Sequence, residues 1–151
     1  MLATARTLLE CDDVERTLWL YDTFSGMTPP DDVDRRLDDG AQASDLLAAS
    51  TRGADIWAVA DLEDVKRTMS LCEYPDGNVR YVVGPVEETL PTIMPSEIAL
   101  LRLDTDWYAS TLQELAHLYP IISPGGVLFI DDYGFWEGQR QAVDDYLARV
   151  A

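Results

Sequence analysis

Two apolar runs that each end on a pair of acids constrain this chain more than any other feature. In "SEIALLRLDTD" the run stops at Asp104 and Asp106, and in "GGVLFIDDYG" it stops at Asp131 and Asp132. The segment between them, "WYASTLQELAHLYP", is typical of a single helix. A strand, a helix and a second strand form a right-handed unit that places the carboxyl ends of its strands together. We therefore predict that Asp104, Asp131 and Asp132 converge at one sheet edge.

The remaining segments predict an α/β fold for the whole chain. Helical patterns fall at residues 1–11, 41–50, 61–72 and 137–150, and further strands end at Asp22 and Val83. The expected order is α-β-α-β-β-α-β-α, typical of a mostly parallel sheet with helices on both faces. At 151 residues the chain is expected to form a single domain. The stretch 25–40, rich in Pro, Gly and Asp, predicts a long surface loop, for which a substrate-facing role and a lid role are both open.

Charge and cysteine content exclude several classes of partner. The chain has 28 acidic against 11 basic residues, a net charge of −17. This argues against nucleic acid and against an anionic membrane surface, both of which are bound through Lys and Arg. Much of the charge is also explained by solubility alone. Cys11 and Cys72 lack metal-ligand spacing, and a reduced, cytoplasmic environment is expected.

The acids at the strand ends predict a divalent cation site. Carboxylates without Cys or His favour Mg²⁺ before Ca²⁺ or Mn²⁺. A structural alternative remains for Asp106, which is well placed to cap the following helix. Asp22 ends an early strand, where an acid in a nucleotide-binding domain binds ribose hydroxyls, although a turn residue explains it too. The aromatic residues beside the acids either line an apolar pocket or simply pack: Trp107, Tyr108, Tyr133 and Trp136.

Four segments together resemble the macrocin O-methyltransferase family: "LWLYDTFSGMTPP", "VVGPVEETLP", "LLRLDTDWYASTLQELAHLYP" and "GGVLFIDDYG". The resemblance covers nearly the whole chain, from about residue 16 to the closing helix. It implies a Rossmann-like class I methyltransferase fold. It also implies an S-adenosylmethionine-dependent, Mg²⁺-dependent enzyme that methylates a sugar hydroxyl of a glycosylated antibiotic. The implied partner is a small glycosylated acceptor, and the resemblance is compatible with a homo-oligomer.

The same resemblance implies a role for each matching residue. Asp104, Asp131 and Asp132 match the metal ligands, and Asp106 matches the general base. The cofactor would be bound by four residues at two strand ends, with ribose at the first pair and adenine at the second: Asp22, Thr23, Gly84 and Val86.

Family segments at both ends have no match in this sequence: the N-terminal lid region, the Gly-rich first strand and the strands that normally follow the last helix. The family's Gly-rich first strand and loop, of the form E-x-G-V-x-x-G-G, precedes the helix that corresponds to residues 1–11. We therefore expect a partial methyltransferase fold. We expect the 151-residue chain alone to bind S-adenosylmethionine weakly or not at all, with little activity.

Three other functions stay open at this point. A catalytically inactive remnant or interaction module would keep the same residues. A D-x-D glycosyltransferase would bind a divalent metal but leaves Asp131 and Asp132 unexplained. A haloacid-dehalogenase-type phosphohydrolase needs a Lys between its two acidic motifs, and Lys66, the only lysine, precedes Asp104.

Overall fold

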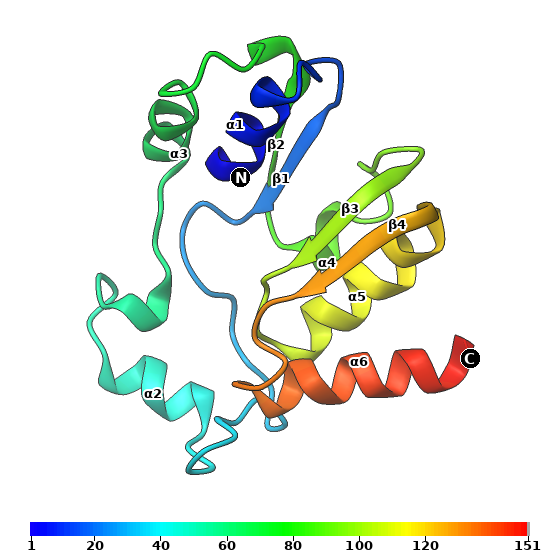
Figure 1. Ribbon diagram of the computed structural model, residues 1–151. Helices are drawn as coiled ribbons and strands as arrows, with labels where there is room; N and C mark the ends of the chain where they lie inside the picture. Colours follow the sequence, from blue (N-terminus) through cyan, green and yellow to red (C-terminus); the bar gives the residue numbers. More distant parts are fainter. Residues whose placement is uncertain (151) are drawn as a thin grey trace.

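The computed structural model describes residues 1–150 and confirms a parallel α/β fold. Strand β1 (Leu18–Asp22) pairs in parallel with β2 (Val79–Val83), and β3 (Ile98–Leu103) pairs in parallel with β4 (Ile122–Ile130). Figure 1 shows both pairs running in the same direction. Over residues 1–150 no backbone ladder joins the pairs, so the strands form two sheets rather than one.

The helices that were expected from the sequence are all present, and one more appears. The α-helices are α1 (Leu2–Glu10), α2 (Ala43–Ala49), α3 (Leu62–Met69), α4 (Val86–Thr89), α5 (Tyr108–Leu118) and α6 (Glu137–Val150). Short 3-10 turns lie at Asp55–Trp57, Asp76–Asn78 and Tyr119–Ile121. Helix α4 separates β2 from β3, which the predicted order placed in direct succession. Its four residues are too few to show helical periodicity.

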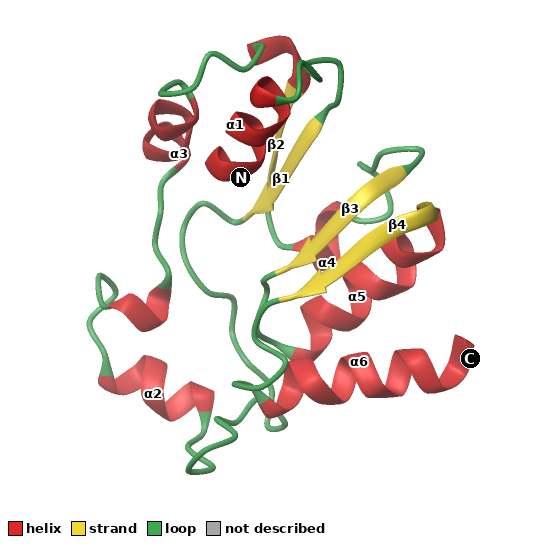
Figure 2. Cartoon of the chain, in the orientation of Figure 1, coloured by secondary structure: helices red, strands yellow, loops and turns green. Residues whose placement is uncertain are grey.

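Two hydrophobic cores lie on opposite sides of β1, because successive side chains of a strand point to opposite faces. Leu18 and Leu20 pack toward α1 and α3, whereas Tyr21 packs toward the core that α5 and α6 form beneath β3 and β4. Figure 2 shows α5 and α6 beside the β3–β4 pair. Among residues 1–150, no helix combines the length and the apolar character that crossing a membrane requires.

A third apolar cluster lies beyond the strand ends and positions the loop that faces the acids. Ala43 and Leu47 of α2 pack there against Trp107 and Trp136, whose rings lie 4.9 Å apart in an edge-to-face arrangement. The Trp107 indole Nε1 donates a hydrogen bond of 2.9 Å to the backbone oxygen of Thr28. The predicted 25–40 loop is therefore fixed against the segments that follow β3 and β4.

Candidate functional site

The register of β3 and β4 brings the acids together. Leu103 pairs with Ile130 at the end of the ladder, and the Asp131 amide donates a hydrogen bond of 3.0 Å to the Leu103 oxygen. Asp104 and Asp131 therefore leave adjacent strands at the same edge. Arg102, one residue before the end of β3, points from the exposed face of the sheet.

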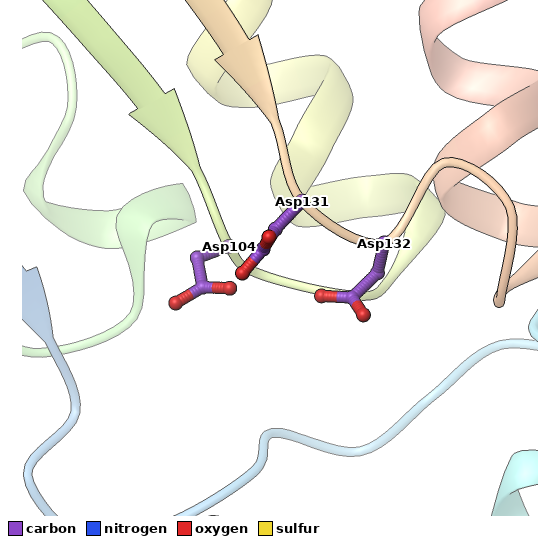
Figure 3. Close-up of side chains that lie close together, drawn as sticks. All are labelled: Asp104, Asp131 and Asp132. Carbon is purple, nitrogen blue, oxygen red and sulfur yellow. The ribbon is translucent and has the colours of Figure 1, made fainter.

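Asp104, Asp131 and Asp132 each place a carboxylate oxygen within 4.8 Å of the others. Figure 3 shows the three side chains close together just beyond the ends of the two strands. The Arg102 guanidinium bridges two of them, with Nη1 2.6 Å from Asp104 Oδ2 and Nη2 in contact with Asp131. The predicted convergence is present, and a cationic group already lies against it.

Crowding of these carboxylates changes how they bind protons. Burial, followed by the hydrogen bond with Asp131, raises the pKa of Asp104 to about 6. The same hydrogen bond and the charge of Arg102 lower the pKa of Asp131. The pair thus shares a proton more readily than two separate carboxylates would, because neighbouring like charges oppose ionisation. A divalent cation would relieve that repulsion.

Asp106 does not cap the next helix, so its carboxylate is not held by the amides at the start of α5. The residue before α5 is Trp107, which makes no side-chain cap, and Asp34 from the long loop accepts the Tyr108 amide instead. Asp106 has a φ of 60°, a left-handed conformation that Asp tolerates better than most residues. Burial and then the charge of Asp132 raise the pKa of Asp106 to about 8.

A cavity of about 430 Å³ opens beside the acids. Asp104, Asp106 and Asp132 form its polar side. The rest of its lining comes from the loop, α2, the 3-10 turn at Asp55–Trp57 and the turn after β4, and combines apolar side chains with two charged ones: Met27, Arg36, Leu46, Asp55, Ile56, Ala58, Phe135 and Trp136. Of the four aromatic residues beside the acids, Trp136 lines this cavity. A molecule bound here would contact both carboxylates and apolar side chains.

The four residues matched to cofactor binding lie at the ends of β1 and β2. The Gly84 amide donates a hydrogen bond of 3.0 Å to the Asp22 backbone oxygen, which places both residues at one edge. Asp22 Oδ1 accepts the Phe24 amide at 2.7 Å, and the Thr23 hydroxyl donates to the Gly26 oxygen at 2.6 Å. The Val86 side chain is buried in the core beneath β3 and β4.

The three carboxylates fit a hard divalent cation. Octahedral Mg²⁺ holds its oxygen ligands at about 2.1 Å, so that neighbouring ligands lie roughly 3 Å apart and opposite ligands roughly 4 Å apart. The spacing within 4.8 Å needs only small side-chain adjustments to reach this geometry. All the donor atoms are oxygens, as Mg²⁺ prefers.

Sequence reasoning missed three residues around the site. Arg102 lies within the apolar run that ends at Asp104 and gave no signal of a site, yet it bridges two of the acids. Asp34 was not distinguished from the other loop acids. Glu114 lies in α5 and is 5% exposed. The signal for Glu114 was its spacing, since it falls four residues before Leu118 on the buried side of the helix.

A family model for macrocin-O-methyltransferase (TylF) matches residues 2–150. The chain is 36% identical over 145 residues to demethyldecarbamoylnovobiocin O-methyltransferase from Streptomyces niveus, with 95% of this chain and 52% of that protein covered. It is also 36% identical over 146 residues to mycinamicin III 3''-O-methyltransferase from Micromonospora griseorubida, with 96% and 55% covered. The chain therefore spans about half the length of these relatives.

A solved structure, that of the O-methyltransferase NovP, has a similar fold. It matches with a TM-score of 0.78 and 34% sequence identity, covering 99% of this chain and 58% of that one. The fold of this chain is thus similar to part of a known O-methyltransferase.

Proposed function

Because the chain belongs to the macrocin-O-methyltransferase family, we propose that it forms part of an S-adenosylmethionine-dependent O-methyltransferase. The acceptor is the sugar hydroxyl of a small glycosylated natural product. The relatives named as novobiocin-precursor and mycinamicin methyltransferases support this substrate class. The observation that carries the proposal is the convergence of three carboxylates from the ends of β3 and β4 beside a cavity.

We assign the cation to Asp104, Asp131 and Asp132. A bound Mg²⁺ supplies Lewis-acid polarisation, which lowers the pKa of an acceptor hydroxyl. The three carboxylates fix where such a cation lies and therefore orient the acceptor relative to the cavity. Burial is the main reason for the raised pKa of Asp104, and the charges of Asp131 and Asp132 add to it. A cation would offset these charges, which favours its binding.

We assign the general base to Asp106. Its carboxylate lines the same cavity as Asp104 and Asp132, so an acceptor hydroxyl held there lies within its reach. Burial makes this carboxylate more basic than an exposed one, which suits a group that removes a hydroxyl proton. The positive charge of a cation held by Asp132 would favour the ionised form needed before the proton is taken.

We assign the cofactor to the edge formed by β1 and β2. Asp22 and Thr23 would bind ribose hydroxyls, while the backbone of Gly84 and Val86 would border the adenine, since the Val86 side chain is buried in the core. S-adenosylmethionine supplies the methyl group. At Gly84 the φ of 133° brings the backbone into a conformation that side-chain-bearing residues rarely adopt, so the turn exposes bare backbone at this edge.

We expect residues 1–151, studied alone, to bind S-adenosylmethionine weakly. The sequence contains no E-x-G-V-x-x-G-G segment, which the family resemblance associates with the methionine end of the cofactor. The β1–β2 edge and the β3–β4 edge are also not joined by a ladder within residues 1–150. The ribose side and the metal side would therefore be held less firmly relative to each other.

Isothermal titration calorimetry tests the proposal in two steps. The purified chain is titrated with Mg²⁺ and then with S-adenosylmethionine, beside D131N and a matched control, D45N. Asp45 is exposed on α2 and outside the cavity lining. We expect Mg²⁺ binding by the wild type and D45N and its loss in D131N. Equal Mg²⁺ binding by D131N and D45N would overturn the metal assignment.

A further inference from the structure

Thr105 lies between the two acids of the D-T-D segment, and its position sets the direction of both. Asp104 directly precedes it, and Asp106 follows with a left-handed φ of 60°. Its hydroxyl donates a hydrogen bond of 2.8 Å to Glu114 Oε2. Its backbone oxygen accepts the Trp107 amide at 2.6 Å and the Ser110 hydroxyl at 3.3 Å. A shift of Thr105 would therefore move the carboxylates on either side.

Glu114 is an unusual residue to place under this segment. Its side chain is in the interior of the fold on α5, at 5% exposure. Burial raises the pKa of Glu114 to about 8, against a smaller lowering by the hydrogen bond from Thr105, and the charges of Glu87 and Asp104 raise it further. Within residues 1–150, the Glu114 side chain accepts a hydrogen bond from the Thr105 hydroxyl, and no Lys or Arg forms an ion pair with it.

An apolar side chain would fill the same place at lower cost. A buried carboxyl loses its hydration, and one hydrogen bond offsets only part of that loss. The remaining neighbours of Glu114 on the buried side of α5 include Leu115 and Leu118, which pack in the core without polar contacts. The one specific interaction that Glu114 gains over an apolar residue is its contact with the D-T-D segment.

We propose that Glu114 is a positioning residue that holds Thr105 so that Asp104 and Asp106 face one cation and one acceptor. This inference rests on the proposed metal-dependent function, because it assigns Glu114 a role toward that site. Glu114 itself lies beneath the segment rather than in the cavity lining. Its effect on metal affinity is therefore indirect, as for groups that orient metal ligands in other proteins.

The test compares E114M, which keeps the volume without an acceptor, with E114Q, which keeps an acceptor. The control is Q113M on the next position of α5, where Gln113 donates to the Leu90 oxygen and does not contact Thr105. T105V removes the donor from the other side of the same hydrogen bond, which gives a second variant if E114M fails to fold.

The first measurement needs no metal. Amide hydrogen exchange at Trp107, whose N–H is bonded to Thr105, reports how firmly the segment is held. We expect E114M and T105V to exchange this amide at least about tenfold faster than Q113M, with E114Q close to the wild type. Unchanged exchange in both E114M and T105V would overturn the inference.

The second measurement is the Kd for Mg²⁺ of each variant by calorimetry. We expect E114M and T105V to weaken binding by about 10- to 100-fold, and E114Q to restore most of the loss. The double variant should lose no more than either single variant, because both remove one hydrogen bond. Failure of the wild type to bind Mg²⁺ would contradict the proposed function, whereas the exchange experiment would still decide the role of Glu114.

Discussion

Asp34 caps a helix that begins 74 residues later in the sequence: its Oδ1 accepts a hydrogen bond of 2.8 Å from the Tyr108 amide at the start of α5. Its Oδ2 accepts the Asp31 amide at 2.7 Å, and the residue is only 1% exposed. A carboxylate at a helix N-terminus is stabilised by the unpaired amides and the helix dipole. This contact joins the cavity-forming loop to the helix that directly follows the D-T-D segment.

We expect D34A to lower the free energy of unfolding by about 1–3 kcal/mol, because it leaves the backbone amides of Asp31 and Tyr108 without an acceptor. Urea unfolding monitored by tryptophan fluorescence measures this change. The control is D32A, which removes an exposed carboxylate from the same loop and should change stability by less than about 0.5 kcal/mol. Matching unfolding midpoints for D34A and D32A would show that the cap contributes nothing.

Gly138 should not tolerate a side chain, although it lies in a helix. A Cβ at this position would lie 1.8 Å from Asp34 Oδ1 and 3.1 Å from the Tyr108 amide nitrogen. Gly to Ala in a helix normally stabilises by about 1 kcal/mol, so we expect G138A to show the opposite sign and unfold at lower urea concentration. G53A is the control, since no atom lies within 4 Å of its Cβ position. A stabilised G138A would contradict the close approach of α6 to Asp34.

Stability should fall as the pH rises from about 5 to about 9 in the metal-free chain. Burial raises the pKa of both Glu114 and Asp106 to about 8 in the folded chain. In the unfolded chain these carboxyl groups titrate at about 4. In this interval the folded chain binds more protons than the unfolded chain, so the free energy of unfolding decreases with pH. E114Q lacks one of the titrating groups and should lose less stability than the wild type over the same interval.

The measurement for that prediction is the urea midpoint at about pH 5.5 and about pH 8.5, with a chelator present. E88Q is the control, because Glu88 is an exposed glutamate on α4. We expect E114Q to gain stability relative to the wild type at the higher pH and E88Q to follow the wild type. Parallel pH profiles for E114Q and E88Q would show that folding does not raise the pKa of Glu114.

Removal of Arg102 should tighten cation binding. Its guanidinium pairs with Asp104 and Asp131, two of the proposed ligands, and it therefore competes with a cation for the same charges. Each exposed pair of this kind is worth about 0.2–1 kcal/mol, so we expect the Mg²⁺ Kd of R102M to fall about two- to tenfold. R80M removes an exposed arginine of β2 as a control. Weaker Mg²⁺ binding by R102M would show instead that Arg102 orients the carboxylates.

The acid site was predictable from sequence because it depends on local rules. An apolar run that ends on acids, followed by one helix and another such run, leaves little choice of topology. Asp104, Asp131 and Asp132 converge for that reason. The capping role considered for Asp106 could not be decided in this way, because the cap of α5 comes from Asp34, in a loop far away in the sequence.

The buried face of α5 shows why other features escaped prediction. The hydrophobic spacing within "WYASTLQELAHLYP" predicts an apolar stripe at Leu112, Leu115, Ala116 and Tyr119. The structure buries Leu115 but leaves Ala116 exposed, and its buried set also includes Ser110, Thr111, Glu114 and Leu118. Polar residues enter the buried face because they bond to the D-T-D segment. Hydrophobic periodicity does not register such contacts, since they depend on tertiary structure.

A crystal structure of the chain grown with Mn²⁺, a substitute for Mg²⁺ that gives an anomalous signal, tests the metal site most directly. We predict one anomalous peak bounded by carboxylate oxygens of Asp104, Asp131 and Asp132, with Arg102 moved away from at least one of its partners. An occupied Mn²⁺ site elsewhere with no peak between these three residues, and Arg102 still bridging Asp104 and Asp131, would contradict it.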